Sequence, residues 1–187
     1  MFRELLLQRV SGFCQLSGSQ LEQLQQHYEL MLRWNKIINL TRIEEIEQVV
    51  DRHYAESLFL GSNLPAGPLR IADVGSGAGF PGVPIAVLRP EVTVVLIESH
   101  QRKAVFLKEA TRGLTNVTVI SKRAEDVRQE FDWVVSRALS WKELQGLTLA
   151  PRLGLIGTDA SGNSIIMPWA NERQIILVSR ETETVLK

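Results

Sequence analysis

The sequence has a single cysteine, no apolar run of about 18 residues, and no excess of either charge. One cysteine, Cys14, excludes a disulfide framework within the chain and is typical of a reducing, intracellular environment. The lack of a long apolar run predicts that no helix spans a membrane. A formal net charge of +0 argues against nucleic-acid binding by bulk charge alone, so any RNA-binding face has to be local. We expect a cytoplasmic protein.

The chain also lacks the spacings typical of a metal site or of nucleophilic catalysis. Its three histidines are scattered, at His27, His53 and His100. They form no metal-ligand pattern, and no Cys/His or Ser/His/Asp arrangement stands out. The sequence therefore predicts no bound metal and no covalent intermediate.

Two regions differ in their pattern along the 187 residues. Residues 1–66 are predicted to form an N-terminal helical extension. In this region Ser19 and Glu22 have capping-box spacing at the start of one helix, and a second helix is predicted over residues 43–60. Residues 67–187 are predicted to form a second region, packed with the first as one unit.

Residues 67–187 alternate short β-branched runs with helical stretches. A helix is predicted over residues 99–114, with Val105, Phe106 and Leu107 on its apolar face and Gly113 at its end. The alternation predicts an α/β fold with a mostly parallel sheet. The predicted strands lie in the segments "LRIADV", "EVTVVLIE", "NVTVIS", "FDWVVS" and, late in the chain, "ERQIILVSRE".

The glycine-rich segment "IADVGSGAGFPG", residues 71–82, follows the first predicted strand and precedes a helix. Such a turn lets backbone N–H groups approach a nucleotide-like ligand. Two frames compete. Gly77, Gly79 and Gly82 give the dinucleotide pattern G-x-G-x-x-G, whereas Asp73 with Gly75 and the next two alternate glycines gives acid-x-G-x-G-x-G. The predicted strand ends at Val74, so Gly75 takes the place of the first glycine, and this favours the second frame.

Two acids accompany this loop. Asp73 lies near the end of the preceding strand and is expected to hold a cationic amino group or to orient the loop. Glu98 ends the next strand, where an acid can accept hydrogen bonds from two ribose hydroxyls. Both NAD enzymes and S-adenosylmethionine enzymes use that position, so the residues alone leave the choice of cofactor open. A dehydrogenase usually has a second domain for its substrate, and the chain has little room for one after the sheet.

Five motifs occur in this order along the chain: "LRWNKIINLT" (32–41), "RHYAESL" (52–58), "DVGSGAGFPGVPIA" (73–86), "RAED" (123–126) and "SRAL" (136–139). Together they resemble one known family, the ribosomal RNA small subunit methyltransferase G family, also called glucose-inhibited division protein B. The resemblance covers roughly residues 4–140 and the final strand. It implies a Rossmann-like class I methyltransferase with an N-terminal helical extension, which uses S-adenosylmethionine to methylate guanine N7 in small-subunit (16S) ribosomal RNA. Free RNA or a ribosomal particle is the implied partner, and a monomer is expected.

The resemblance also implies site residues. Arg137 is expected to line the cleft between cofactor and substrate, with His53 and Asn39 near the mouth of the active site. The implied cofactor contacts are Asp73, Gly75, Gly77, Gly79, Phe80, Glu98, Ala124, Glu125 and Arg137. Guanine N7 carries a lone pair and no proton, so the implied reaction requires positioning and electrostatics rather than a general base.

Several of these residues have a structural alternative. Phe80 and His53 could be packing residues, Asn39 could belong to a turn, and Glu125 could cap a helix. Two alternatives for the whole protein also stay open. One is a cofactor- or RNA-binding module without turnover, and the other is a methyltransferase for another RNA base or a small molecule.

The basic residues and the C-terminal segment bear on the substrate. Residues 99–142 contain 9 Lys and Arg against 5 Asp and Glu, while residues 1–70 contain 7 and 8. An RNA face would have to assemble scattered residues, for example Arg33, Lys36, Arg52, Arg102 and Lys103. The segment 150–171 departs from the family, because "LGLIG" has no lysine-glycine pair after it and "TDASGNS" predicts a turn in place of a helix.

Overall fold

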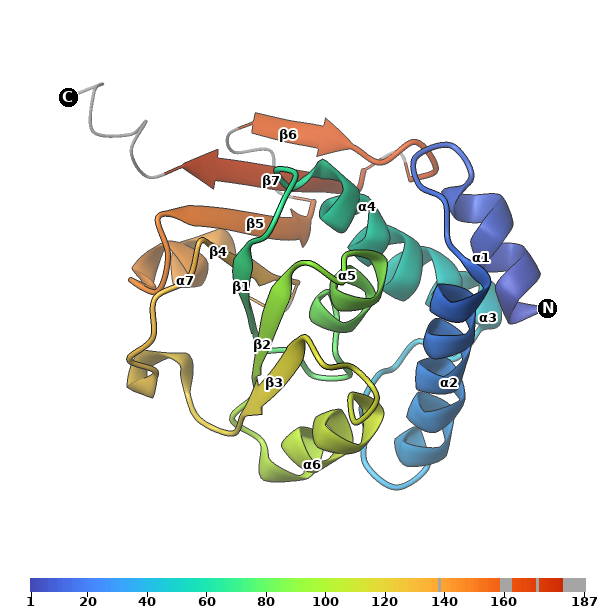
Figure 1. Cartoon of the computed structure of the whole chain (residues 1–187), viewed down its shortest axis with the longest axis horizontal. Coiled ribbons are helices and arrows are strands. Elements are labelled where there is room, and N and C mark those ends of the chain that lie inside the picture. The colour runs from blue at the N-terminus through green and yellow to red at the C-terminus, as the bar shows by residue number, and fades with distance from the viewer. Residues whose placement is uncertain (138, 159–162, 171, 180–187) are drawn as a thin grey trace.

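The computed structural model describes residues 1–137, 139–158, 163–170 and 172–179. Its centre is a seven-stranded sheet in the order β3-β2-β1-β4-β5-β7-β6 (Figure 1). Neighbouring strands from β3 to β5 are parallel, and β7 runs antiparallel to both β5 and β6. The strands are β1 (Arg70–Val74), β2 (Thr93–Ile97), β3 (Val117–Ile120), β4 (Trp133–Ser136), β5 (Arg152–Gly157), β6 (Asn163–Ile166) and β7 (Gln174–Ser179).

All five strands predicted from the sequence are present, and a β-strand over "LGLIG" joins them as part of β5. β1 is central, because Asp73 is paired with Leu96 of β2 on one side and with Val135 of β4 on the other. The carboxyl ends of these parallel strands therefore meet at one edge of the sheet, which is where open α/β sheets bind ligands.

Helices cover the two faces of the sheet unequally. The buried cluster on one face joins side chains of α1, α2, α4, α5 and α6, whereas the cluster on the other face is closed by α7 and the segment 124–131 (Figure 1). The helices are α1 (Phe2–Val10), α2 (Gly18–Asn35), α3 (Ile46–Val49), a π-helix (Val50–Ala55), α4 (Glu56–Asn63), α5 (Gly82–Leu88), α6 (Gln101–Ala110), a 3₁₀ turn (Ala124–Asp126) and α7 (Trp141–Gly146).

The start of α2 corrects the predicted cap. The N-cap is Ser17, not Ser19, and its hydroxyl accepts the N–H of Gln20 at 3.3 Å. Gln20 rather than Glu22 completes the capping box, because its side-chain amide can both accept and donate hydrogen bonds. Its Oε1 accepts the N–H of Ser17 at 2.9 Å, and its Nε2 donates to the carbonyls of Val87 and Leu88. Glu22 pairs instead with Arg3.

The predicted helix over residues 43–60 is displaced and interrupted. It begins at Ile46, ends at Asn63, and contains a π-helix over Val50–Ala55. Apolar spacing does not reveal this wider turn, since the buried Val50 and Tyr54 lie four residues apart, as on one face of an ordinary α-helix. π-Helical turns occur often at functional sites.

The prediction for α6 was also wrong in two details. Val105 is 54 % exposed, because the buried face of the helix carries Ala104 and Leu107, three residues apart, with Phe106. The helix ends at Ala110 rather than at Gly113. The hydroxyl of Thr111 donates to the carbonyl of Leu107 at 2.7 Å and so satisfies one group at this end.

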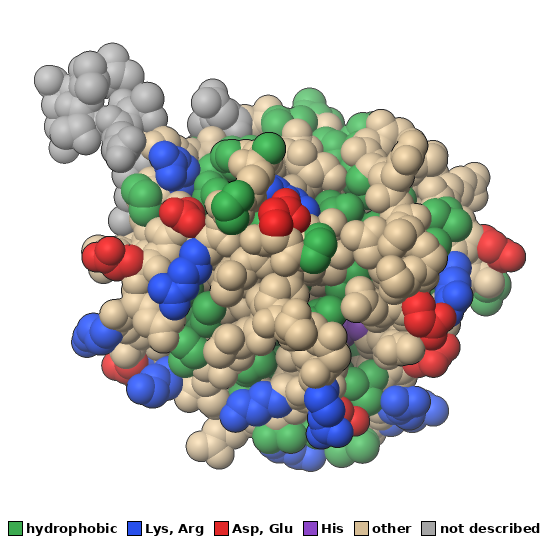
Figure 2. Space-filling view, viewed as in Figure 1, with side chains coloured by type: hydrophobic (Ala, Val, Ile, Leu, Met, Phe, Trp, Pro, Cys, Tyr) green, Lys and Arg blue, Asp and Glu red, His purple; other side chains and the backbone are tan. Residues whose placement is uncertain are grey.

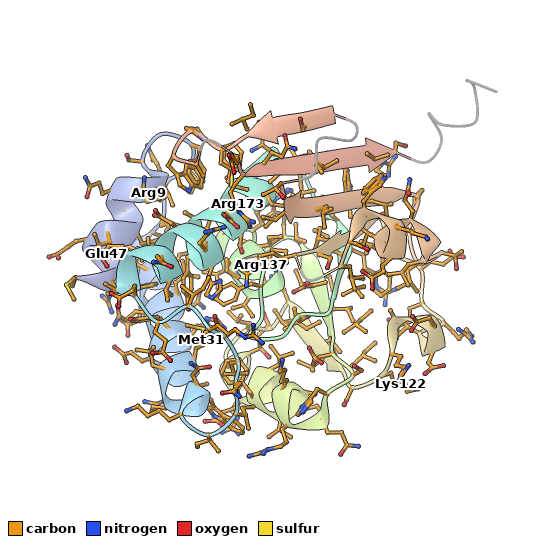
Figure 3. The ribbon with its side chains drawn as sticks, turned by 180° about the vertical axis from the view of Figure 1, so that it is seen from behind. Arg9, Met31, Glu47, Lys122, Arg137 and Arg173 are labelled. Atoms are coloured by element: carbon orange, nitrogen blue, oxygen red, sulfur yellow. The ribbon has the colours of Figure 1, made fainter. Side chains whose placement is uncertain are left out.

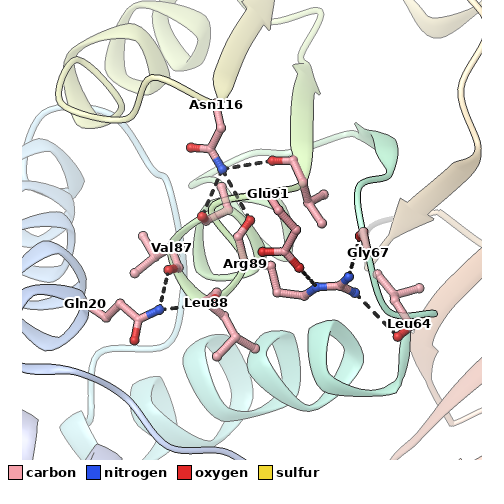
Figure 4. Close-up of polar contacts among 10 residues, drawn as sticks. Gln20, Leu64, Gly67, Val87, Leu88, Arg89, Glu91 and Asn116 are labelled. Carbon is pink, nitrogen blue, oxygen red and sulfur yellow. Dashed lines mark hydrogen bonds and ion pairs between the residues drawn. The ribbon is translucent and has the colours of Figure 1, made fainter.

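Side chains from distant elements fix the end of α5 (Figure 4). The Nδ2 of Asn116, just before β3, donates to the carbonyls of Ala86 at 3.0 Å and Val92 at 2.9 Å. Arg89 donates to the carbonyls of Leu64 and Gly67, at 3.4 and 2.8 Å. The bond to Ala86 satisfies a carbonyl that the end of α5 leaves free, and the other bonds tie this end to the neighbouring segments, so they hold the helix that follows the glycine loop.

Candidate functional site

The glycine loop begins directly after β1. β1 ends at Val74, so Gly75 is the first residue of the turn, as the acid-x-G-x-G-x-G frame requires. Gly75, Gly77 and Gly79 have φ values of 72°, 57° and 91°, in the left-handed region that strains other residues. The N–H groups of Gly75 and Ser76 both point to the carbonyl of Ile97, so the loop bends over the end of β2.

Gly82 is required for close packing. A Cβ at this position would lie 2.3 Å from Leu96 Cδ2 and 2.7 Å from Asp73 Oδ2. The N-terminus of α5 therefore contacts β1 and β2 more closely than any side chain would allow.

Asp73 connects the strand to this helix. Its side chain is fully buried, and Oδ2 accepts the N–H of Gly82 at 2.9 Å. Oδ1 is buried and has no hydrogen-bond partner among the described residues. Burial raises the pKa of Asp73 from 3.8 to about 7, and the hydrogen bond from Gly82 opposes this rise. One carboxylate oxygen thus stays available for a cationic or hydrogen-bonding ligand.

Glu98 holds the loop from the other side. Its Oε2 accepts the N–H of Gly77 at 2.9 Å, and its Oε1 accepts the N–H of His100 at 2.8 Å. Each oxygen has a second lone pair, so these bonds leave acceptor capacity for a hydroxyl. In this structure the carboxylate orders the two loops that follow β1 and β2.

A cavity of about 430 Å³ opens at this edge of the sheet. Val74, Gly75 and Ile97 come from the ends of β1 and β2, and Ala124 and Glu125 come from the 3₁₀ turn. The remaining lining residues are Ser99, Lys122, Arg123, Leu139, Glu143 and Leu147. Its lining combines apolar side chains, among them Val74, Ile97 and Leu139, with polar and charged ones, which suits a flat heteroaromatic ligand that also carries polar groups.

Phe80 lies in the core next to this loop. Its ring is 2 % exposed and stacks on the His53 ring with centroids 4.7 Å apart. Tyr54 and His27 contact it edge-on, at 5.0 and 5.3 Å. The side chain does not line the cavity, so a cofactor contact from Phe80 would come from its backbone.

Arg137 and His53 are brought together although 84 residues separate them. Nη1 of Arg137 donates to Nδ1 of His53 and, at 2.7 Å, to the carbonyl of Arg52. Because Arg137 can only donate, Nδ1 accepts and the proton of the neutral ring lies on Nε2, which contacts Thr41 Oγ1 at 2.7 Å. The guanidinium also lies 5.4 Å from the centroid of the Phe80 ring.

Burial sets the charges of this pair. Burial first and the charge of Arg137 second lower the pKa of His53 from 6.5 to about 3. Burial also lowers the pKa of Arg137 to about 10, which leaves it cationic at neutral pH. The site therefore holds one cation beside a neutral imidazole.

Asn39 lies in the loop that carries Thr41, two residues before the contact of Thr41 with His53. Asn39 is exposed, whereas Asn35 organises the same loop, because its Oδ1 accepts the N–H groups of Leu40 and Thr41, both at 2.9 Å. Sequence analysis missed Asn35 and Thr41. The signal was available, since a polar Asn as the last residue of a helix often bonds to the backbone that follows.

Sequence analysis also missed a buried ion pair. Both oxygens of Glu56, which is fully buried, accept from Arg173, with Nε and Nη2 each 2.6 Å away. The two residues help to line a cavity of about 460 Å³ with Asp51, Arg52 and Trp169. No local pattern could have found a pair separated by 117 positions.

The described ranges hold no group of three or more His, Cys, Asp or Glu that could bind a metal ion. They also hold no helix with the length and apolar character needed to cross a bilayer.

The sequence model of one protein family, described as "GidB: rRNA small subunit methyltransferase G", matches residues 20–150. The chain belongs to this family. Among its relatives, a protein of Nitrosospira multiformis named Ribosomal RNA small subunit methyltransferase G is 45 % identical over 129 residues, which cover 67 % of this chain and 59 % of that protein. One of the same name from Chromobacterium violaceum is 42 % identical over 130 residues, 67 % of this chain and 62 % of that protein. The chain thus aligns with about three fifths of the length of these curated relatives.

Solved structures agree on the fold. A SAM dependent methyltransferase from Aquifex aeolicus superposes with a TM-score of 0.51 at 16 % identity, covering 67 % of this chain and 76 % of that chain. A chain of the fibrillarin/Nop5p complex gives a TM-score of 0.51 at 13 % identity, covering 68 % and 80 %. The predicted family is confirmed, and so is the predicted class I methyltransferase fold with its N-terminal helices.

Proposed function

We propose that this protein uses S-adenosylmethionine to methylate N7 of a guanine in small-subunit (16S) ribosomal RNA. The observation that carries the proposal is the 430 Å³ cavity beside the glycine loop, with the Arg137–His53 pair at the same edge of the sheet. Family membership and the names of the relatives support it.

The residues present fit the cofactor. The apolar walls made by Val74, Ile97 and Leu139 suit an adenine ring, with Ala124 and Glu125 on the side of the 3₁₀ turn. The unpartnered Oδ1 of Asp73 is a buried acceptor that a cationic amino group would satisfy. Glu98 keeps free lone pairs for ribose hydroxyls, and the glycine loop allows the ligand to approach the backbone.

Bound S-adenosylmethionine supplies an electrophilic methyl group on a sulfonium. Guanine N7 needs no deprotonation, so the protein's task is to place the base in line with that methyl group. His53 is not placed to remove a proton, since both ring nitrogens are occupied and its pKa is about 3. We assign Arg137 the role of holding a phosphate or a base edge with its remaining N–H donors, and His53 the role of orienting Arg137. For Asn39, which is exposed in the neighbouring loop, we propose a contact with RNA.

The surface offers local positive charge for RNA. The side chains of Arg33, Lys36, Arg52 and Arg102 are exposed, and Lys103 is partly exposed. Lys and Arg side chains follow the lower rim of the molecule, where α6 and the lower end of α2 lie (Figure 2). Contacts to phosphates from this rim would make binding weaken as the salt concentration rises.

We further propose that residues 1–66 and 67–187 act as one packed unit, as a monomer in the cytoplasm. One buried cluster supports the first point, since it joins Leu6 and Met31 with Leu96 and Ile156.

Labelled S-adenosylmethionine, incubated with undermethylated small-subunit particles and separately with naked 16S RNA, tests the function. The expected result is methyl incorporation that saturates at one group per RNA. Calorimetric binding of S-adenosylhomocysteine without incorporation would indicate a binding module. Incorporation at another base would indicate a different methyltransferase.

A further inference from the structure

The buried Glu56–Arg173 pair joins the C-terminal hairpin to the segment that holds Arg137. Glu56 is the first residue of α4 and follows the π-helix that carries Arg52 and His53. Arg173 directly precedes β7, beyond the part of the chain that the family model matches. Figure 3 shows Arg137 and Arg173 beside the same helical stretch.

The turn that presents Arg173 is well anchored. The N–H of Arg173 donates to the carbonyl of Ala170 at 3.1 Å, and the N–H of Met167 donates to the carbonyl of Arg173 at 3.0 Å. Trp169 of the same turn stacks on Phe13 at 5.3 Å and meets Phe59 edge-on at 5.5 Å. The guanidinium therefore reaches Glu56 from a fixed position.

Arg137 lies within the electrostatic range of both partners. Glu56 raises the pKa of Arg137, and Arg173 lowers it. Among the described residues, however, Arg137 forms no ion pair, and its acceptors are the carbonyl of Arg52 and the neutral ring of His53. Both carboxylate oxygens of Glu56 instead accept from Arg173 in a bidentate contact.

Removing Arg173 would leave Glu56 as a buried carboxylate without a partner. Such a group is costly and either takes up a proton or recruits the nearest cation. Two cations lie near Glu56: Arg52, which is exposed and lines the same cavity, and Arg137, whose pKa Glu56 raises. Recruitment of Arg137 would draw its guanidinium away from His53 and from the cleft.

We propose that Arg173 is a positioning residue for Arg137: by pairing with Glu56, it keeps the guanidinium of Arg137 on His53 and the π-helix, facing the substrate. This inference rests on the proposed methyltransferase function. It assigns a role in the site to Arg173, directly before the final strand and next to the segment 150–171 that departs from the family pattern.

The test compares an Arg173→Met variant with the double variant Glu56→Leu/Arg173→Met, which removes both charges. The single variant should lower kcat for methyl transfer at least about tenfold. The double variant should return kcat to within about threefold of the wild type, because no buried anion is then left to capture Arg137. Arg9→Met is the matched control. Arg9 makes a similar bidentate contact with Asp51 of the π-helix, at 2.6 and 3.0 Å. Loss of this contact should leave kcat unchanged.

A second measurement does not depend on activity. Nitrogen-15 NMR of the His53 ring reports whether Nδ1 still accepts from Arg137. The signal should shift in Arg173→Met and return in the double variant. An unchanged signal and kcat in the single variant, or a double variant no better than the single one, would overturn the proposal.

Two further outcomes are decisive. If Arg173→Met does not fold, the NMR spectrum of the double variant is the test. A His53 nitrogen signal in the double variant that differs from the wild-type signal would then overturn the inference. If the wild-type protein transfers no methyl group, the proposed function fails, while the NMR comparison still tests the positioning of Arg137.

Discussion

Arg137 donates to Nδ1 of His53, and this bond fixes the tautomer of a histidine that is 1 % exposed. The same nitrogen of Arg137 reaches the carbonyl of Arg52, so two adjacent residues of a π-helix hold one cation. The relationship changes the meaning of the "RHYAESL" motif. Its histidine accepts a hydrogen bond from an arginine, and we propose that it orients this arginine rather than exchanging a proton.

Replacing His53 tests this role. His53→Asn places an acceptor oxygen close to the position of Nδ1, whereas His53→Leu removes the acceptor. We expect His53→Leu to lower kcat by about tenfold to a hundredfold, because one charged hydrogen bond of about 1.5–3 kcal/mol is lost. His53→Asn should retain most of the wild-type kcat. Equal losses in both variants, measured by methyl incorporation, would argue that ring stacking on Phe80 matters instead.

Replacing Glu125 tests whether the cavity binds the cofactor without destabilising the fold, because this side chain is exposed and lines the cavity. Glu125→Ala should weaken S-adenosylhomocysteine binding by about 1–2 kcal/mol if its carboxylate accepts a hydrogen bond from the ligand. Asp126→Ala is the control, since Asp126 is exposed on the same 3₁₀ turn but does not line the cavity. Isothermal calorimetry that finds equal affinities for the two variants would place the ligand elsewhere.

Gly82 should be among the least tolerant positions of the loop. Gly82→Ala forces a methyl group into Leu96 and Asp73, and overpacking of this kind typically costs about 1–3 kcal/mol of unfolding free energy. Gly113→Ala should change it by less than about 0.5 kcal/mol, because a Cβ there meets no atom within 4 Å. Urea unfolding of both variants checks the difference, and a stable Gly82→Ala protein would contradict the close packing of α5.

Asp73 should make the free energy of unfolding depend on pH. Its pKa rises from 3.8 to about 7 on folding, so the stability that it contributes is complete below pH 3.8 and is lost as the pH rises to about 7. The span corresponds to about 4 kcal/mol. Asp73→Asn keeps an acceptor for Gly82 and should remove this slope. Urea titrations from pH 4 to pH 8 should therefore show that the unfolding free energy of Asp73→Asn increases relative to that of the wild type as the pH rises. Parallel curves of unfolding free energy against pH would contradict the burial of an ionisable Asp73.

The buried histidines act in the opposite direction. Burial lowers the pKa of His27 to about 4 and that of His53 to about 3. Because the unfolded histidines take up protons near pH 6.5, the stability that these residues contribute is present above that pH and is lost as the pH falls toward 4. The comparison of Asp73→Asn with the wild type cancels this shared effect.

Local patterns were enough to predict β1 to β4, β7 and the start of the glycine loop, whereas β6 was not predicted. β1 to β4 and β7 have β-branched runs bounded by turns, and the short distance from Val74 to Gly75 decided between the two glycine frames. The cap at Ser17 was missed because two serines have the same spacing to a polar partner. Only the tertiary contacts of Gln20 with α5 separate them.

The rest of the site depends on contacts that no local pattern contains. The contact of Arg137 with His53 and the pairing of Glu56 with Arg173 join positions 84 and 117 residues apart. The π-helix over Val50–Ala55 is local, but its apolar spacing does not distinguish it from an α-helix. Burial decides the placement of Phe80, whose ring belongs to the core. The roles of Asn39, Ala124 and Glu125 stay predictions until the variants are measured.

The most direct test of the account is to locate the methyl group. N7-methylation gives guanine a positive charge and makes the strand sensitive to reduction followed by aniline cleavage, so primer extension maps the modified base. We predict one new stop in 16S RNA after incubation of small-subunit particles with the wild-type protein and S-adenosylmethionine, and a stop weakened at least about tenfold with Arg137→Ala. No stop with a protein that binds S-adenosylhomocysteine, or a stop of equal strength with Arg137→Ala, would contradict it.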